Sequence, residues 1–298
     1  GAKSVTDSPL MPVYAPSPAN FVRGEGARLF DASGRSWLDF IAGIAVNGLG
    51  HCHPALVAAL KAQSEKLWHV SNLYQTDLQR SLAQRYVDAT FADVVYFSNS
   101  GTEAVETALK VARRFHATNG APERIDIIGF EGAFHGRTYG AINAAGNPNY
   151  LDGFGPRLPG YVRLGWGDHE ALKAAVASPT AAAVIVETPD IMTVAKGVGG
   201  GFPLGACLAT GRAAEGMVKG THGSTYGGNP LAMAVGHAVW DELTKPELLE
   251  HVRRISGHFT QSLEGLKDTH PDLVVEVRGK GLLRGLKLTV DPLPVRTA

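Results

Sequence analysis

Hydrophobic and polar positions change their spacing along the chain, and each spacing predicts a type of element. Residues 21–40 alternate between apolar and polar side chains and break at 31–34, which predicts a short β-meander. Residues 54–68 repeat apolar side chains every three or four positions, which predicts a helix. The inward side chains of that helix are expected to be Leu56, Ala59, Leu60 and Leu67.

Strand and helix patterns alternate over residues 94–187. Alternation of this kind predicts an α/β fold in which helices cover a mostly parallel central sheet. The first helix of this region follows a buried strand and should place Val105, Leu109 and Ala112 on one side. We therefore expect a central sheet with this helix packed across it.

The last third of the chain begins a new pattern at Pro230, a favourable residue for a first helical position. Two helices and then two strands are expected there, at 231–243, 248–266, 274–277 and 282–288. We expect residues 46–245 to form a large domain. Residues 1–45 and 246–298 should together form a smaller α+β domain.

Composition agrees with a soluble globular protein of 298 residues, about two domains on the usual length relation. The 28 basic and 28 acidic side chains balance, so bulk charge recruits neither nucleic acid nor an anionic membrane. No apolar run reaches the length of a membrane span, and the first residues lack a hydrophobic signal core. With only two cysteines, the chain is expected in a reducing cytoplasm.

Lys196 is the most informative residue, because an apolar strand at 191–195 delivers it to a glycine-rich turn at 197–205. A lysine with its ordinary pKa of about 10.4 is a protonated surface cation. One held in a dry site beside an aldehyde can lose its proton and attack. The alternative is a solvated lysine at a strand end. A nucleotide loop is a weaker interpretation, since the turn lacks a Gly-Lys-Ser/Thr ending.

Ser100, Gly101 and Thr102 form a turn between a buried strand and a helix. Free N–H groups and the positive end of the helix dipole make such a turn an anion site, to which the two hydroxyl groups add donors. A phosphate group would bind well there. The alternative is a capping box, in which the hydroxyl of Ser100 or Thr102 caps the helix and the side chain of Glu103 or Glu106 bonds back to the cap. Capping and anion binding are compatible roles.

Phe134, His135 and Arg137 follow the apolar strand at 125–130, at the strand end where open α/β sheets bind ligands. Phe134 could stack on a planar ring, and the rigid fork of Arg137 could bind a carboxylate. The alternative is that Phe134 belongs to the core and Arg137 to a surface ion pair.

His51, Cys52 and His53 are adjacent and invite a metal assignment. Adjacent residues rarely converge on one ion, and no second pair of ligands at zinc-like spacing follows, so no metal site is expected.

The order of these segments along nearly the whole chain resembles the class III pyridoxal-phosphate-dependent aminotransferases. Within that family the resemblance is greatest to the acetylornithine/succinyldiaminopimelate group. The matching stretches are 47–54, 68–74, 98–103, 134–137, 195–197 and 221–230.

The resemblance implies the type I fold of pyridoxal-phosphate enzymes and a role for each candidate residue. Lys196 would hold pyridoxal 5′-phosphate covalently and act in catalysis, while Arg137 and Glu187 would contact the substrate. Thr225 would reach the phosphate bound by a neighbouring subunit, which implies a homodimer with shared active sites. The other residues of the cofactor site would be Ser100, Gly101 and Thr102 at the phosphate, Phe134 on the ring, and His135.

The implied reaction moves the terminal amino group of N-acetylornithine, or a close analogue, to 2-oxoglutarate. The products would be the semialdehyde and glutamate, as in arginine or lysine biosynthesis. The sequence does not separate acetylornithine from ornithine, succinyldiaminopimelate or succinylornithine. Two alternatives stay open: an aminotransferase for another terminal amine, and a relative without catalysis that serves as a binding or regulatory subunit.

The chain departs from the family at Glu187-Thr188. Relatives insert a strand–helix–strand unit here, which takes roughly 30 residues or more. That unit carries the aspartate that pairs with the pyridine nitrogen, and Asp241 and Glu242, inside a later helix, do not replace it. Either the intact polypeptide contains the segment, which we favour, or it has been deleted. The resemblance also implies that the domain at 246–298 is incomplete.

Overall fold

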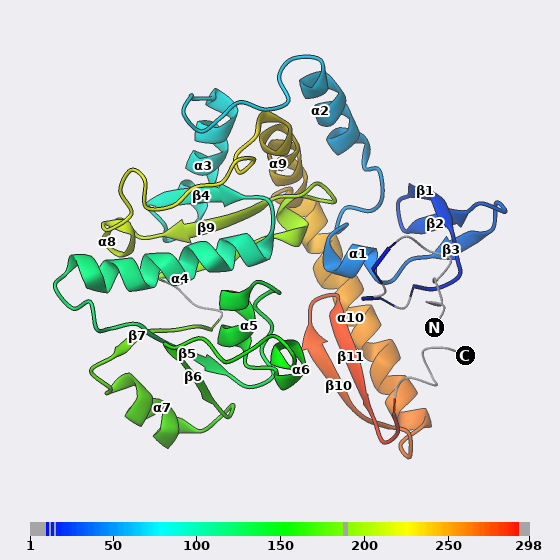
Figure 1. Ribbon diagram of the computed structural model, residues 1–298. Helices are drawn as coiled ribbons and strands as arrows, with labels where there is room; N and C mark the ends of the chain where they lie inside the picture. The colour runs from blue at the N-terminus through cyan, green and yellow to red at the C-terminus, as the bar shows by residue number, and fades with distance from the viewer. Residues whose placement is uncertain (1–9, 12, 15, 187–189, 292–298) are drawn as a thin grey trace, which may run out of the picture.

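The structure is a computed structural model that describes residues 10–291, except for 12, 15 and 187–189. Figure 1 shows a large α/β region and, beside it, the N-terminal strands and the last helix with its hairpin. None of the helices in the described part of the chain is long and apolar enough to cross a bilayer.

The predicted N-terminal meander is confirmed as strands β1 (Phe21–Glu25), β2 (Arg28–Asp31) and β3 (Ser36–Leu38), paired antiparallel in that order. Asp31 organises the turn, since its carboxylate accepts hydrogen bonds from the Ser33 hydroxyl and from Trp37 Nε1 at 2.6 and 2.8 Å. These two bonds lower the pKa of Asp31 to about 2.

Helix α2 (Pro54–Ser64) begins where the sequence predicts but ends four residues early. Trp68 Nε1 donates to the carbonyl of Ser64 at 2.6 Å, and the Gln63 side chain donates to the carbonyl of Leu67 at 2.8 Å. These side chains bond the backbone in place of another helical turn. The expectation that Leu67 points inward is therefore wrong, and Leu67 is 43% exposed, whereas Leu56 is buried.

The large region has two halves, each built on a separate three-stranded sheet of described residues. The sheet of one half has the order β4-β9-β8 and is antiparallel. Its strands are β4 (Val94–Ser98), β9 (Gly205–Ala209) and β8 (Ile191–Val194). Helices α3 (Asp77–Ala89) and α9 (Pro230–Leu243) pack with it, and Leu82, Leu208 and Met233 are fully buried between them. Pro230 is the first residue of α9, as predicted.

The other half has the order β6-β5-β7 and is parallel. Its strands are β5 (Asp126–Phe130), β6 (Tyr161–Leu164) and β7 (Ala181–Val184). The helices on this half are α5 (Tyr139–Ala145), α6 (Pro148–Leu151) and α7 (His169–Val176). Two short helices are α1 (Ala42–Ala45), which follows the N-terminal strands, and α8 (Gly211–Ala214), which contacts α4 and β9.

Helix α4 (Gly101–Thr118) joins the two halves, because it contacts β8 and β9 on one side and β7 and α5 on the other. The predicted inward side chains Val105, Leu109 and Ala112 are all buried. Among the described residues, β7 and β8 do not pair with each other. Parallel neighbours need a connection of about a dozen residues or more, and residues 185–190 are too few.

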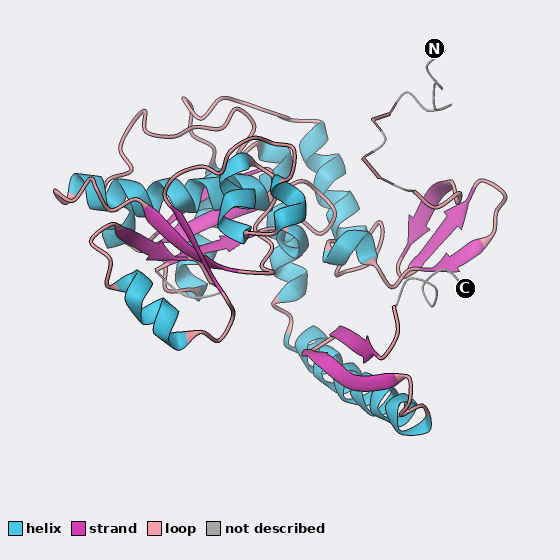
Figure 2. Ribbon diagram, turned by 60° about the horizontal axis from the view of Figure 1, so that its bottom comes forward, coloured by secondary structure: helices cyan, strands magenta, loops and turns pink. Residues whose placement is uncertain are grey.

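Helix α10 (Pro246–Thr269) and strand β10 (Val274–Lys280) are longer than predicted, whereas β11 (Leu283–Leu288), which pairs with β10 in a hairpin, begins one residue later than predicted. Figure 2 shows this unit and the β1–β3 meander as separate groups of elements beside the large region. The domain boundaries at 45 and 245 stay a prediction.

Candidate active site

Lys196 begins a short 3₁₀ helix, η1 (Lys196–Val198), directly after β8. Its φ of 57° lies in the left-handed region, a backbone conformation that costs residues other than glycine about 1–3 kcal/mol. Such strain is found preferentially at functional sites. The Lys196 side chain is exposed, so the strand and the glycine turn by themselves do not create the dry surroundings expected from the sequence.

Ser100 caps helix α4 in the way that the capping-box interpretation predicts. Its hydroxyl accepts from the Glu103 N–H at 3.3 Å and donates to Glu103 Oε2 at 2.7 Å. The N–H groups of Gly101 and Thr102, in the first helical turn, have no intrahelical acceptor. With the helix dipole they offer donors to an anion, so the cap is compatible with the predicted anion site, which stays a prediction.

The start of α4 touches the residue before Lys196. A Cβ atom on Gly101 would lie 3.2 Å from Cβ of Ala195, which is tighter than an ordinary contact. The structure thus places the lysine strand against the candidate phosphate turn, although the two are far apart in the sequence.

The start of α4 also touches the 134–137 turn. Gly136 has a φ of 118°, and a Cβ atom there would overlap Oγ1 of Thr102. Thr138 strengthens this contact, because its backbone N–H donates to Thr102 Oγ1 at 3.4 Å and its hydroxyl bonds Glu106. All three candidate segments therefore meet at the first turn of α4.

Thr138 was missed from the sequence. It caps helix α5, where its hydroxyl accepts from the Ala141 N–H at 3.4 Å. A threonine directly before an apolar helical run is the usual signal of a cap and could have identified it.

Phe134 and Arg137 project from the turn that follows β5. Phe134 is 59% exposed, so the core interpretation of this ring is wrong. Arg137 is exposed, and its Cζ atom lies 3.9 Å from the centroid of the Tyr150 ring and 5.8 Å from that of Phe134. His135, between them, is half-buried.

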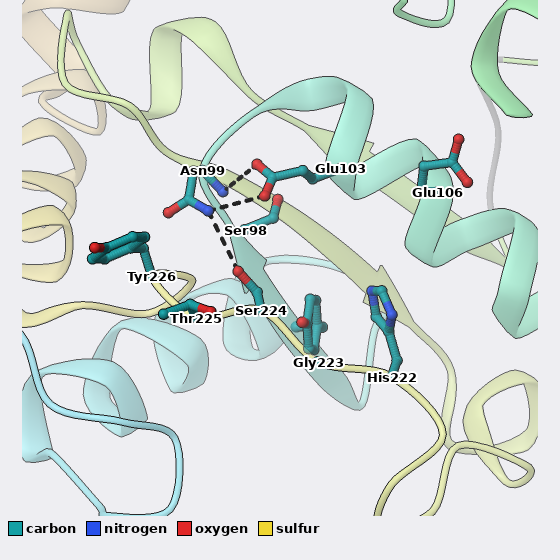
Figure 3. A pocket seen from close by; sticks show the side chains of 10 residues that line it. Ser98, Asn99, Glu103, Glu106, His222, Gly223, Ser224, Thr225 and Tyr226 are labelled. Carbon is teal, nitrogen blue, oxygen red and sulfur yellow. Dashed lines mark hydrogen bonds between the residues drawn. The ribbon is translucent and has the colours of Figure 1, made fainter. Parts of the chain in front are cut away.

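Thr225 is exposed beside a cavity of about 350 Å³ that extends along one side of the α4 start. Figure 3 shows the Asn99 amide between Glu103 and Ser224, to which it donates at 3.0 and 3.4 Å. These bonds occupy the Glu103 carboxylate. Burial raises the pKa of Tyr96 in the same cavity, and the nearby Glu103 raises it further.

Two other sequence candidates have a plain outcome. Glu187 lies outside the described residues. His51 binds Asp39 through Nε2 at 2.7 Å. Within the described ranges, no three His, Cys, Asp or Glu side chains converge on a position for a metal ion.

Comparison with known proteins gives a family match in two parts. The family described as aminotransferase class-III matches residues 11–188 and 181–293. Acetylornithine aminotransferase 2 of Caulobacter vibrioides is 53% identical, over 94% of this chain and 82% of its own. Acetylornithine aminotransferase of Agrobacterium fabrum is 49% identical, over 95% and 84%.

Solved structures agree in fold. The ornithine aminotransferase of Toxoplasma gondii superposes with a TM-score of 0.90 at 27% identity, covering 96% of this chain and 82% of that one. The acetylornithine aminotransferase of Elizabethkingia anophelis gives a TM-score of 0.81 at 29% identity, with 95% and 83% covered. The predicted fold class is confirmed.

The matches also locate the departure seen in the sequence. The aligned region with the Caulobacter relative spans 333 positions, whereas this chain has 298 residues, so at least 35 positions lack a counterpart here. The two parts of the family match overlap over 181–188, which covers β7 and the start of its connection to β8.

We predict that Gly136→Ala lowers the free energy of unfolding by more than about 1 kcal/mol, because the new methyl group would overlap Thr102 in a left-handed backbone. Gly132→Ala is the control, since Gly132 also has a positive φ of 78° but faces open space. Urea unfolding measures both. Equal losses in the two variants would contradict the close contact at the start of α4.

Proposed function

Since the chain belongs to the class-III aminotransferase family, we propose that it moves the terminal amino group of N-acetylornithine to 2-oxoglutarate, giving the semialdehyde and glutamate. Membership of this family makes the chain a transaminase that depends on pyridoxal 5′-phosphate. Relatives named acetylornithine aminotransferase, 41–53% identical over 94–99% of this chain, support the choice of donor. The observation that carries the proposal is the contact between Gly101 and Ala195, the neighbour of Lys196.

The residues at the start of α4 fit two ends of pyridoxal phosphate. Ser100, Gly101 and Thr102 offer hydroxyl and backbone donors to the phosphate. Lys196 lies one residue beyond the contact with Gly101, which supports the proposal that its amine reaches the aldehyde end. A side chain at position 101 would meet Ala195, which explains the glycine between the two hydroxyl residues.

The pyridine nitrogen of this cofactor usually has an acidic or arginine partner. The described acidic side chains at the start of α4 are already engaged, Glu103 by Asn99 and Ser100, and Glu106 by Thr138. By resemblance, the ring partner belongs to the segment that relatives carry between β7 and β8.

Lys196 has two roles in the proposed mechanism. It would hold the cofactor through its side chain, and its amine, when free, would move a proton at the amino-bearing carbon of the substrate. Pyridoxal phosphate, when bound, supplies the electron sink that makes this proton acidic. The exposed side chain of Lys196 implies that substrate, cofactor or a second subunit must exclude water from the finished site.

Arg137 fixes the orientation of the substrate in this proposal. Its planar guanidinium matches a carboxylate with two parallel hydrogen bonds. Binding the α-carboxylate of acetylornithine at Arg137 would leave the terminal amine free to reach Lys196. Glutamate would bind with its α-amine toward the lysine, so one site has to accept both orientations.

A homodimer in the cytoplasm is part of the proposal. Exposed rings at Trp68, Tyr74 and Tyr226 are 65%, 65% and 61% exposed, and aromatic side chains are enriched at subunit interfaces. Thr225, also exposed, would then bind the phosphate held by the second subunit. Cys52 and Cys207 are both free, which suits a reducing compartment.

The first prediction from this proposal concerns Lys196→Ala. After addition of pyridoxal phosphate, we expect the variant to lack the visible absorbance of lysine-bound cofactor and to lose transamination by at least about 10³-fold, because the amine is the attachment point and the base. Lys173→Ala is the control, since the Lys173 side chain is 79% exposed on α7. Parental absorbance and turnover in Lys196→Ala would refute the assignment.

The second prediction concerns Arg137→Lys, which keeps the positive charge but removes the planar guanidinium that can donate two parallel hydrogen bonds to a carboxylate. We expect a KM for acetylornithine and for glutamate about 10-fold higher or more, with cofactor affinity unchanged, because the phosphate is held at α4. Arg254→Lys, at an exposed position of helix α10, should behave as the parent. Steady-state kinetics and a cofactor titration measure these effects. Parental KM values would make Arg137 a surface residue only.

The third prediction is that the intact polypeptide contains a segment between Glu187 and Thr188. The motivation is that β7 and β8 do not pair within the described residues and that relatives carry at least 35 more aligned positions. Intact-mass spectrometry should then give more than 31.5 kDa, and peptide mapping should place the excess at this junction. A Glu187-Thr188 peptide bond in the digest would establish a deletion and favour the binding-subunit alternative.

A further inference from the structure

We propose that Tyr150 is a positioning residue for substrate carboxylates, because its ring holds the Arg137 guanidinium. The inference rests on the proposed function, in which Arg137 binds the substrate carboxylate. Neither the sequence pattern nor the resemblance assigns a role to Tyr150.

The side chains of Tyr150, Arg137 and Phe134 form a cluster. The Arg137 Cζ atom lies over the Tyr150 ring, 3.9 Å from its centroid, and is 5.8 Å from the centroid of Phe134. The two rings meet edge to face, with centroids 6.2 Å apart and an interplanar angle of 87°. A guanidinium over an aromatic face at this distance makes a favourable cation–π contact.

The backbone beside Tyr150 is firmly held. Gly146, with a φ of 68°, ends α5, and its carbonyl accepts from Arg163 Nη1 of β6 at 2.9 Å. Asn147 then caps α6, accepting from the Asn149 N–H at 3.0 Å, and Pro148 fixes the first helical residue. Tyr150 is half-buried, so its ring is presented from a defined position.

Arg137 needs such a support. It is exposed, and within the described part of the chain no carboxylate lies within ion-pair distance of it. A free arginine side chain loses much rotamer freedom when it binds a ligand. Stacking restricts that freedom beforehand and uses only the flat face of the guanidinium. The N–H donors at its edge stay directed outward, where a carboxylate can accept two of them.

The two rings in contact with Arg137, Phe134 and Tyr150, have different roles. Phe134 is expected to lie on the cofactor ring, so its ring would be shared between the cofactor and Arg137. Tyr150 belongs to α6, which is fixed to β6 through Gly146, and therefore provides the support that does not depend on the cofactor. Loss of the Tyr150 ring should then weaken carboxylate binding and leave cofactor binding and proton transfer unchanged.

The test compares Tyr150→Leu with Tyr150→Phe, which keeps the ring. Tyr150→Leu should raise KM for both amino donor and 2-oxoglutarate roughly 3- to 30-fold, with kcat within about threefold of the parent. Tyr150→Phe should restore the parental KM. Phe154→Leu is the matched control, because Phe154 is a nearby ring, 60% exposed, that stacks on no arginine among the described residues.

A binding measurement separates this inference from the proposed function. Calorimetric titration with glutarate, a dicarboxylate without amine or ketone, reports on the Arg137 site whatever the true amino donor is. We expect Tyr150→Leu to weaken glutarate binding by the same factor as KM, with an unchanged thermal midpoint and cofactor affinity. In an Arg137→Gln background, Tyr150→Leu should add no further loss, since Tyr150 acts through Arg137.

Three results would overturn the role of Tyr150: parental glutarate affinity in Tyr150→Leu, equal damage in Tyr150→Phe, or additive losses in the double variant. If the parent protein binds glutarate in the way described but does not use acetylornithine, the proposed donor is wrong and the role of Tyr150 stands.

Discussion

The close approach of two loops to the first turn of α4 is the contact on which the site depends. Gly101 lets Ala195, the neighbour of Lys196, pack so closely that a Cβ atom at position 101 would lie 3.2 Å from its side chain, and Gly136 lets the turn bearing Phe134 and Arg137 pack on Thr102. The same turn presents free N–H groups and the positive end of an 18-residue helix. One short segment therefore offers the donors of the proposed phosphate site and packs against both the strand that leads to the lysine and the turn that bears the arginine.

Helix α4 also connects the two halves of the large region. Its buried side chains Val105 and Leu109 pack against Ile127 of the parallel half, while its other side contacts β8 and β9. Among the described residues, β7 and β8 do not pair, so backbone hydrogen bonds between strands do not join the two halves. Helix α4 connects them instead, by packing against both. The segment that relatives carry at this junction would add strand pairing and, by resemblance, the acidic partner of the pyridine nitrogen.

Features set by local sequence could be predicted, and features set by contacts between distant segments could not. The inward face of α4 and the start of α9 at Pro230 follow from periodicity and turn chemistry, and both are confirmed. Leu67 was misplaced because side chains of Gln63 and Trp68 end α2 early, which periodicity does not reveal. The contact of Tyr150 with Arg137 joins α6 to the turn that follows β5, so no spacing rule indicates it.

We infer that the start of α4 presents the cofactor aldehyde to Lys196 and to no other amine. The most direct test is to add pyridoxal phosphate to the intact protein, reduce it with borohydride, digest it and locate the modified lysine by mass spectrometry. The account predicts a single reduced cofactor adduct on the peptide that contains Lys196, suppressed by an excess of inorganic phosphate. An adduct spread over exposed lysines such as Lys110, with Lys196 unmodified, would contradict it.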